Sequence, residues 1–223
     1  MSGDDTGLRQ VVGPLRGFDR SALATHPLEA ATALLGALLV REDPGAPTGR
    51  VAARIVETEA YHEDEPASHS HRGRTARSEP MFWNPGTAYV YRSYGVHWCC
   101  NVVVEAAEVG AAVLLRAAVV LEGEEAIAPR RPAARRPRDL LRGPGNLTAG
   151  LDLDGPRHDR GDLICGVAGV RLARDGFRPP ATRIAAGPRV GVSLAADLPW
   201  RRFLADVPEV SGYRRSPRAA QPR

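Results

Sequence analysis

Two glutamates and one arginine stand in apolar segments of this chain, where a charged residue is unusual. Glu57 and Glu59 lie near the end of the segment RVAARIVETEAY (residues 50–61), and Arg116 interrupts the run VLLRAAVV. A positioned carboxylate can act as a general base that takes a proton from water. On a strand, residues two apart project from the same face, roughly 7 Å from each other. These carboxylates mark either the mouth of a pocket or the solvated end of a strand.

The charge of Arg116 requires a partner, because burying an unpaired charge in a central strand is strongly unfavourable. We expect Glu57 or Glu59 to be that partner. Such a pair would form a structural salt bridge, and it would also hold the carboxylate in its ionised form. The sequence alone supports both interpretations.

Aromatic side chains concentrate in the same part of the sequence. Seven of the twelve lie between Tyr61 and Trp98. Tyr61 and Tyr91 can form the two walls of a slot for a planar heterocycle. Tyr94 stands beside Gly95 in the turn of an expected hairpin, where a tyrosine can stack on nucleic-acid bases. The alternative is that they are ordinary core aromatics and a surface tyrosine.

The hydrophobic pattern predicts a mixed α/β protein in which strands predominate. A helix is expected from Pro27, because proline suits the first helical position and Glu29 suits the first turn. Apolar runs and alternation predict strands at 38–41, 50–61, 87–91, 96–104, 111–121, 163–172 and 189–193. In the second of these strands, alternation places six side chains on one face: Val51, Ala53, Ile55, Glu57, Glu59 and Tyr61. We therefore expect one domain with a largely antiparallel sheet and flanking helices.

Length and composition fit one globular domain. The chain has 223 residues, of which 43% are hydrophobic and 25% charged, enough apolar material for a sizeable core. No stretch approaches about 18 consecutive apolar residues, so no membrane-spanning helix is expected. The acidic start, residues 1–5, differs from a secretory signal, and we expect a cytoplasmic protein. Cys99, Cys100 and Cys165 lack metal-site spacing and are expected to be reduced core residues.

Arginine occupies all 30 of the lysine and arginine positions. The absence of lysine excludes mechanisms that need a lysine amine, such as a Schiff base, a pyridoxal phosphate linkage or a P-loop. Residues 129–142 carry six arginines and residues 213–223 carry four. These segments are either solvated loops or contacts to nucleic-acid phosphates. We expect a flexible arm over 1–17, the main domain over 18–212 and a basic tail over 213–223.

Six motifs, in order and at near-matching spacing, resemble the alkyladenine (3-methyladenine) DNA glycosylase family. They are VETEAY (56–61), the acidic loop ending in His69 and Ser70, MFWNPGTAYVYRSYG (81–95), Asn101 in CCNV, VLLRA (113–117) and GPGNL (143–147). The resemblance covers about residues 20–195. It implies a compact domain whose curved antiparallel sheet carries a protruding hairpin that intercalates into damaged double-stranded DNA. It also implies base-excision repair of purines of the 3-methyladenine, 7-methylguanine, hypoxanthine and ethenoadenine class.

The resemblance assigns chemical roles to four residues. Glu59 matches the general base that activates water against the sugar, and Arg116 matches the arginine beside that water. A backbone carbonyl near Val192 would also hold the water. Tyr94 would enter the DNA in place of the flipped nucleotide. This reaction requires no metal and no cofactor, and without a lysine the product would be an intact abasic site.

The resemblance also places the damaged base. The flipped purine would lie between Tyr61 and Tyr91. His69 would contact it from the acidic loop, with His71 as the competing candidate. Asn101 would shape the pocket and discriminate against a guanine amino group. The preferred damaged base is left open.

Two other classes of protein fit parts of the pattern. A metal-dependent hydrolase would use His62, His69 and His71, although a HxH spacing alone is a weak signal. A non-catalytic damaged-DNA-binding protein would keep the scaffold without releasing a base. The six motifs together favour a glycosylase, which we expect to be a monomer associated with the bacterial nucleoid.

Overall fold

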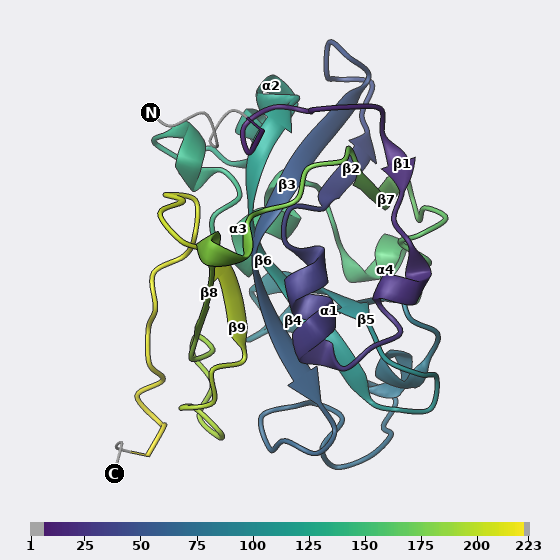
Figure 1. Cartoon of the computed structure of the whole chain (residues 1–223), viewed down its shortest axis with the longest axis vertical. Helices are drawn as coiled ribbons and strands as arrows, with labels where there is room; N and C mark the ends of the chain where they lie inside the picture. Colours follow the sequence, from purple (N-terminus) through teal and green to yellow (C-terminus); the bar gives the residue numbers. More distant parts are fainter. Residues whose placement is uncertain (1–6, 221–223) are drawn as a thin grey trace.

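An antiparallel β-sheet of nine strands forms the centre of the molecule (Figure 1). The computed structural model describes residues 7–220; the first six residues of the predicted arm and the last three of the predicted tail lie outside the described residues. The main path runs β1-β7-β2-β3-β6-β5-β4, and every strand pair in the described chain is antiparallel. The predicted fold class is confirmed. The strands are β1 (Arg16–Gly17), β2 (Leu38–Glu42), β3 (Arg50–His62), β4 (Ala88–Ser93), β5 (His97–Val103), β6 (Ala111–Glu122), β7 (Val170–Arg174), β8 (Ile184–Gly187) and β9 (Arg201–Leu204).

The long strand β3 is the axis of the sheet, because it has neighbours along both edges. One edge pairs with β6 from Ala52 to His62. The other edge pairs first with β2, as far as Arg54, and then with β9, from Glu57. Residues 51–60 are all buried.

Strands β3 and β6 each carry an extra residue where they face each other. Val56 of β3 and Arg116 of β6 have no partner in the register, which shifts on either side of Glu57. A β-bulge of this kind changes which side chains reach each face of the sheet. The two bulges lie at the place where the charged residues of both strands are found.

The bulges correct one prediction about β3. Ile55 and Ala60 are separated by an odd number of positions, which places side chains on opposite faces of a regular strand. Both nevertheless pack in the main core. The prediction that Glu57, Glu59 and Tyr61 share a face with Ile55 is therefore wrong. The bulge turns these three side chains away from the main core, to the other face of the sheet.

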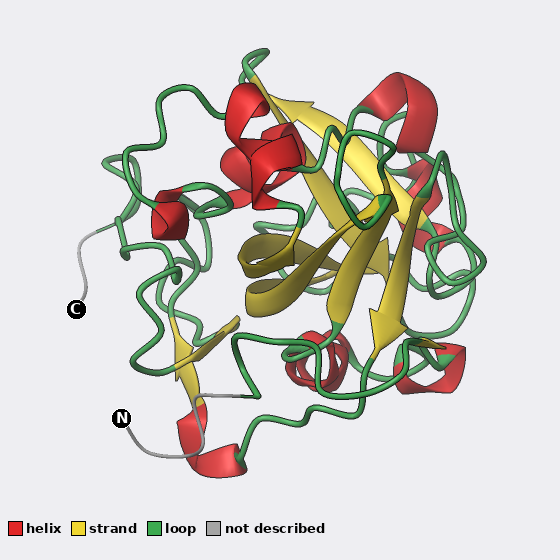
Figure 2. Ribbon diagram, turned by 90° about the horizontal axis from the view of Figure 1, so that it is seen from above, coloured by secondary structure: helices red, strands yellow, loops and turns green. Residues whose placement is uncertain are grey.

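The helices are short and lie around the sheet (Figure 2). The longest described helix, α1 (Pro27–Leu34), begins where predicted, and the side chain of His26 accepts a hydrogen bond from the Leu28 amide. It packs on β3, where Thr58 Oγ1 donates to the carbonyl of Ala31 over 3.0 Å. Among residues 7–220, no helix is both long and apolar enough to cross a membrane.

The remaining helices occupy the connections between strands. The α-helices are α2 (Glu124–Ile127), α3 (Pro144–Gly150) and α4 (Gly155–His158), and the 3₁₀ helices span Arg20–Ala22, Glu79–Phe82, Ala128–Arg130, Pro137–Asp139 and Ala181–Arg183. Of these, α3 contacts both β5 and β6. It therefore supports the strands that carry the charged and aromatic residues.

The strand predicted at 163–172 forms only in part. The structure has β7 there, which begins at Val170. The preceding residues form a turn, because the side chain of Asp162 accepts hydrogen bonds from the amides of Ile164 and Cys165. An aspartate that bonds to amides two and three residues further on competes with a strand in this way.

The prediction of a strand at 189–193 is wrong. Gly191 adopts a left-handed backbone with φ of +75°, and Arg189 turns inward to pair with Glu65 at 2.5 Å and 2.7 Å. The segment is therefore a loop beside the sheet. Strands β1, β8 and β9 were not predicted, because two to four residues are too few to show a period.

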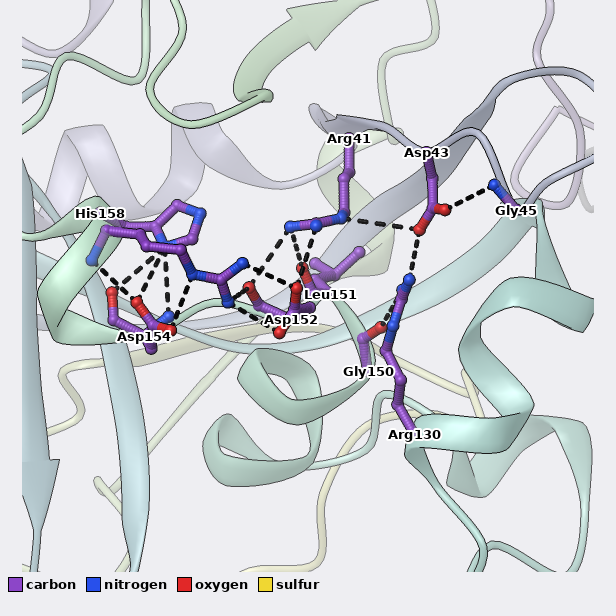
Figure 3. A network of polar contacts seen from close by, with 10 residues as sticks. Arg41, Asp43, Gly45, Arg130, Gly150, Leu151, Asp152, Asp154 and His158 are labelled. Carbon is purple, nitrogen blue, oxygen red and sulfur yellow. Dashed lines mark hydrogen bonds and ion pairs between the residues drawn. The ribbon is translucent and has the colours of Figure 1, made fainter.

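A network of arginines and aspartates connects the C-terminal end of β2 to the helical connections (Figure 3). Arg130 donates to Asp43, and Arg41 Nη2 donates to Asp152 Oδ2 over 3.0 Å. Arg157 Nη1 donates to the same oxygen of Asp152 over 2.9 Å. The hydrogen bonds from Arg130 and Arg157 lower the pKa of Asp43 and of Asp152, respectively, below the ordinary value.

The described part of the predicted arm, residues 7–17, contacts the sheet. Leu8 is buried, and Arg54 Nε donates to its carbonyl over 3.1 Å. Arg54 also forms a fully buried ion pair with Asp175 at 2.7 Å. The last two residues of this part form β1, which pairs with β7.

Candidate active site

Four neighbouring strands place one side chain each in a row across the sheet. Glu59 of β3 faces Leu114 of β6. Leu114 in turn faces Asn101 of β5, which faces Tyr89 of β4. Directly opposed residues project from the same face, with Cβ atoms roughly 5 Å apart. All four side chains line a cavity of about 740 Å³.

This cavity contains the predicted site in full. Its wall is built from β3 to β6, the acidic loop after β3 and the loop after β8. All eight site residues predicted from the sequence line it: Glu59, Tyr61, His69, Tyr91, Tyr94, Asn101, Arg116 and Val192. The fold thus brings together residues that are more than 130 positions apart in the sequence.

The carboxylate of Glu59 is fully buried and held by three neighbours. Tyr61 donates its hydroxyl to Oε2 over 2.9 Å, and Arg116 Nη1 lies 3.2 Å from the same oxygen. The amide of Val190 donates to Oε1 over 2.7 Å. These contacts fix the orientation of the carboxylate on the cavity wall. The group is therefore equipped to accept a proton from a molecule in the cavity.

Arg116 bridges the two carboxylates of β3. Its Nε donates to Glu57 Oε1 over 2.8 Å, while its Nη1 contacts Glu59. Burial alone would lower the pKa of Arg116, but the charges of Glu59 and Glu57 raise it above the ordinary value. The sequence left the partner open, and the structure pairs this arginine with both glutamates.

Tyr61 forms one wall of the cavity and is kept neutral. Burial, and then the charge of Glu59, raise the pKa of Tyr61 well above its ordinary value. The guanidinium of Arg189 lies 4.6 Å from the centre of the Tyr61 ring. Arg189 is itself buried and paired with Glu65. The ring is thus fixed by a charged pair behind it.

Tyr91 and His69 belong to a second aromatic group in the cavity wall. The two rings meet edge to face, with centroids 4.7 Å apart. His69 Nδ1 shares a hydrogen bond of 2.9 Å with the hydroxyl of Tyr89. The guanidinium of Arg77 lies 5.1 Å from the centre of the Tyr91 ring. Burial and the nearby charge of Arg77 lower the pKa of His69 to about 4, so its ring is neutral near pH 7.

The other two histidines of the metal hypothesis have different surroundings. His71 shares a hydrogen bond of 2.8 Å with the carbonyl of Glu63 and is not part of the cavity wall. His62 stacks on His26 with ring centroids 5.7 Å apart. Within residues 7–220, no group of three or more His, Cys, Asp or Glu side chains is placed to hold a metal. The geometry gives the metal-hydrolase hypothesis no support.

The β4–β5 hairpin presents Tyr94 at its tip. The side chain is 90% exposed, although it also borders the cavity. The backbone of Tyr94 has φ of +49°, a left-handed conformation that is uncommon for a bulky residue. Such a conformation persists where the surrounding structure enforces it and is often found at functional positions. The hairpin thus holds a large aromatic ring in solvent beside the mouth of the cavity.

The adjacent cysteines of β5, Cys99 and Cys100, lie on opposite faces of the strand. Cys100 packs in the main core, whereas Cys99 lines the cavity. Cys165 is exposed, so the prediction that it is a core residue is wrong.

Asn101 is buried, and its Nδ2 donates to the carbonyl of Tyr89 over 3.0 Å.

Two groups at the site were missed by the sequence analysis. The backbone amide of Val190 contacts Glu59, two positions before the predicted Val192, which lies on the cavity wall. Ser211 bonds to Glu57 from the C-terminal part of the chain. A backbone amide and a lone serine carry no residue-type signal, so only the folded geometry reveals them.

The first arginine-rich segment is largely occupied by internal contacts. Arg130 bonds to Asp43 of the network above. Arg131 and Arg142 donate to backbone carbonyls, and Arg136 donates to Asp139 over 2.8 Å. Four of the six arginines in this segment therefore bind the protein itself, and they are less available for nucleic-acid phosphates.

Comparison with known proteins agrees with the geometry. The family model described as methylpurine-DNA glycosylase matches residues 21–208. A protein of Nocardia farcinica named "Putative 3-methyladenine DNA glycosylase" is 46% identical over 205 residues, which cover 88% of this chain and 92% of the relative. Proteins of the same name from Mycobacterium sp. strain KMS and Rhodococcus jostii are 46% and 43% identical, with 90% and 87% of this chain covered and 95% and 84% of the relatives.

The chain therefore belongs to the methylpurine-DNA glycosylase family, whose members are hydrolases of N-glycosyl bonds in DNA. In this member of the family, one face of the sheet carries a cavity with a buried carboxylate, aromatic walls and an exposed hairpin tyrosine at its border. DNA is accordingly the class of substrate.

Proposed function

We propose that the protein excises alkylated or deaminated purines from double-stranded DNA. The damaged nucleotide rotates out of the helix into the cavity, and a water molecule activated by Glu59 cleaves its N-glycosidic bond. The observation that carries this proposal is the buried Glu59 carboxylate on the cavity wall, held by Tyr61, Arg116 and Val190. The products are the free base and an intact abasic site.

The chemical step needs one proton acceptor. The water oxygen bonds to the sugar C1′ while the electrons of the N-glycosidic bond pass to the departing purine. A cationic purine then leaves as a neutral base, whereas an uncharged purine takes up a proton from solvent as it leaves. Glu59 accepts the proton that the water releases, as a general base. Arg116 touches the same carboxylate and orients it. Val192 lines the cavity on the side of the loop that holds Glu59 and would contribute a carbonyl to the water.

The aromatic walls suit a flat and often cationic base. Alkylation of a ring nitrogen puts positive charge on the purine, which improves the leaving group. A cationic base between the rings of Tyr61 and Tyr91 gains cation–π attraction in addition to stacking. His69, which borders the same cavity, would contact the edge of the base. Asn101 limits the space beside it and would disfavour a guanine amino group.

Flipping leaves a gap in the DNA stack that must be filled. Tyr94 is exposed at the hairpin tip beside the cavity mouth. Its ring can enter the gap and stack on the neighbouring bases. Extrusion costs least for a damaged or mispaired base, which contributes to selection. We propose that the protein acts as a monomer on chromosomal DNA in the bacterial cytoplasm.

The test is base release from defined duplexes. Purified protein is incubated in EDTA with labelled DNA that carries one hypoxanthine or one ethenoadenine, and in parallel with methylated DNA. Each sample is divided and treated with or without alkali. We expect free base in EDTA and strand cleavage only after alkali, because the chain has no lysine to form a Schiff base with the abasic site. Tight binding without release of any base would instead identify a non-catalytic damage-binding protein.

A further inference from the structure

The C-terminal segment, residues 209–215, passes behind the candidate active site and lies beyond residue 208, where the family match ends. It runs along the β8–β9 side of the molecule (Figure 1). Contacts to five other parts of the chain hold it in place: Glu209 with Arg9, Val210 with Arg142, Ser211 with Arg201, Arg214 with Gly191 and Arg215 with Asp197. The segment is therefore a fixed part of the fold.

Ser211 is the residue of this segment that reaches the charged centre. Its amide donates to Glu57 Oε2 and its hydroxyl to Glu57 Oε1, each over 2.8 Å. The hydroxyl oxygen also accepts a hydrogen bond of 3.1 Å from Arg116 Nη2. Ser211 and Glu57 are not part of the cavity wall, whereas Glu59 and Arg116 are. Because Ser211 does not line the cavity itself, it can affect the cavity through its contacts with Glu57 and Arg116.

The arrangement divides one arginine between two carboxylates. Glu57 receives hydrogen bonds from Arg116, Arg201 and Ser211, whereas Glu59 has only Arg116 as a directly contacting cation in the described residues. If Glu57 loses a donor, it attracts Arg116 more strongly. Arg116 would then move away from Glu59. The donors on Glu57 therefore determine how close Arg116 stays to the Glu59 carboxylate on the cavity wall.

The same segment also supports the opposite side of Glu59. The carbonyl of Arg214 accepts a hydrogen bond of 3.0 Å from the amide of Gly191. Gly191 follows Val190, whose amide contacts Glu59 Oε1 over 2.7 Å. The C-terminal segment is thus linked to Glu59 Oε2 through Arg116 and to Glu59 Oε1 through Gly191 and Val190.

We propose that Ser211 is a positioning residue for base excision, which satisfies Glu57 so that Arg116 remains available to Glu59. This inference rests on the proposed function, because it concerns the same carboxylate. The segment extends the working site to residues outside the family match. The charged and titratable groups around this centre are Tyr61 of β3, Tyr91 of β4, Cys99 of β5, Arg116 of β6, Arg201 of β9 and Arg189 of the loop after β8.

The direct test is the titration of the Glu59 carboxyl group, followed by ¹³C NMR and assigned by its absence in Glu59→Gln. Ser211→Ala should raise the titration midpoint of Glu59, because Arg116 shifts towards Glu57. Glu57→Gln should lower it, because Arg116 is left to Glu59 alone. The two shifts should be opposite in sign. Ser216→Ala should leave the midpoint unchanged, because Ser216 is a serine of the same tail whose hydroxyl bonds only to the Arg218 amide in the described residues.

A rate measurement completes the test. Ser211→Ala should slow single-turnover base release about tenfold, as expected for loss of a hydrogen bond to a charged group, with unchanged affinity for damaged DNA. Ser211→Thr keeps the hydroxyl and should restore the rate. The proposal is overturned if both Ser211→Ala and Glu57→Gln move the Glu59 midpoint in one direction, or if Ser211→Ala matches Ser216→Ala. The titration needs no DNA, so the predicted shifts without any base release would overturn the proposed function instead.

Discussion

Glu57 and Glu59 are the same residue type two positions apart, yet their surroundings give them different tasks. Glu59 lines the cavity, and its carboxylate is fixed by two hydrogen-bond donors, Tyr61 and the Val190 amide, and by an ion pair with Arg116. Glu57 lies outside the cavity wall and is satisfied by Arg116, Arg201 and Ser211. In the proposed mechanism, Glu59 acts on the substrate, and Glu57 positions the arginine that contacts Glu59. A chemical role thus follows from what a side chain touches.

The neutral state of His69 gives a pH prediction at the same scale. Burial and the charge of Arg77 lower its pKa from 6.5 to about 4. The unfolded chain therefore binds a proton between these pH values that the folded protein does not. The contribution of His69 to stability is complete above pH 6.5 and is lost as the pH falls towards 4.

An NMR titration of the histidine rings measures this directly. We expect His69 to titrate near pH 4, and Arg77→Gln to raise that value because it removes a nearby positive charge. A histidine-containing model peptide serves as the reference. A His69 midpoint near that of a free histidine would show that its ring is solvated and charged more readily than the cavity geometry indicates.

At the scale of elements, two β-bulges place the site. Val56 and Arg116 interrupt the pairing of β3 and β6, which moves Glu57, Glu59 and Tyr61 to the cavity face. The sequence predicted the strand, the helix from Pro27 and the antiparallel class, because these depend on runs of apolar residues. It could not predict the bulges, since one skipped residue depends on the partner strand and leaves no periodic signal.

The candidate site, too, could be predicted only in part. The side chains with an unusual type or setting were found in advance, among them a buried arginine and a clustered set of tyrosines. The Val190 amide and Ser211 were not, because their role depends on loops and a C-terminal segment folding back on the sheet. The predicted strand at 189–193 failed for a related reason: the inward ion pair of Arg189 with Glu65 could not be read from its own segment.

The hairpin tip supports a prediction about DNA binding. Tyr94→Ser should weaken binding to a duplex with one damaged base by about 1–3 kcal/mol at fixed salt, the value of one stacked base. Val12→Ser is the control, because Val12 is also an exposed apolar side chain but does not line the cavity. Equal affinity of Tyr94→Ser and the wild type, measured by fluorescence anisotropy, would rule out intercalation by this ring.

At the scale of the whole molecule, arginine side chains make many of the contacts that join distant segments of the chain. The chain has 30 arginines and no lysine, and many of them pair with carboxylates or carbonyls of distant segments. Arg54 joins the N-terminal part of the chain to Asp175, and the network around Asp43 and Asp152 joins β2 to the helical connections. A planar guanidinium with several donors suits such multiple contacts. Part of the basic charge of the sequence therefore serves the internal structure.

The buried pair gives a stability prediction. Arg54→Leu should lower the free energy of unfolding by about 3–5 kcal/mol, because it leaves Asp175 buried without its partner. Arg50→Leu removes a pair with Glu122 in which the arginine is 38% exposed, so its cost should stay below about 1 kcal/mol. Chemical denaturation of both variants measures the difference. If both variants lost a similar free energy of unfolding, the buried pair would not be a principal source of stability.

The central claim is that Glu59 activates water in a cavity that holds a flipped purine. The most direct measurement compares Glu59→Gln with the wild type on one duplex, for binding and for single-turnover base release. The glutamine keeps the shape of the side chain but does not act as the base. We predict binding within a few-fold of the wild type and base release at least about 100-fold slower, the usual contribution of a general base. Base release at the wild-type rate would contradict the role of Glu59 and the account built on it.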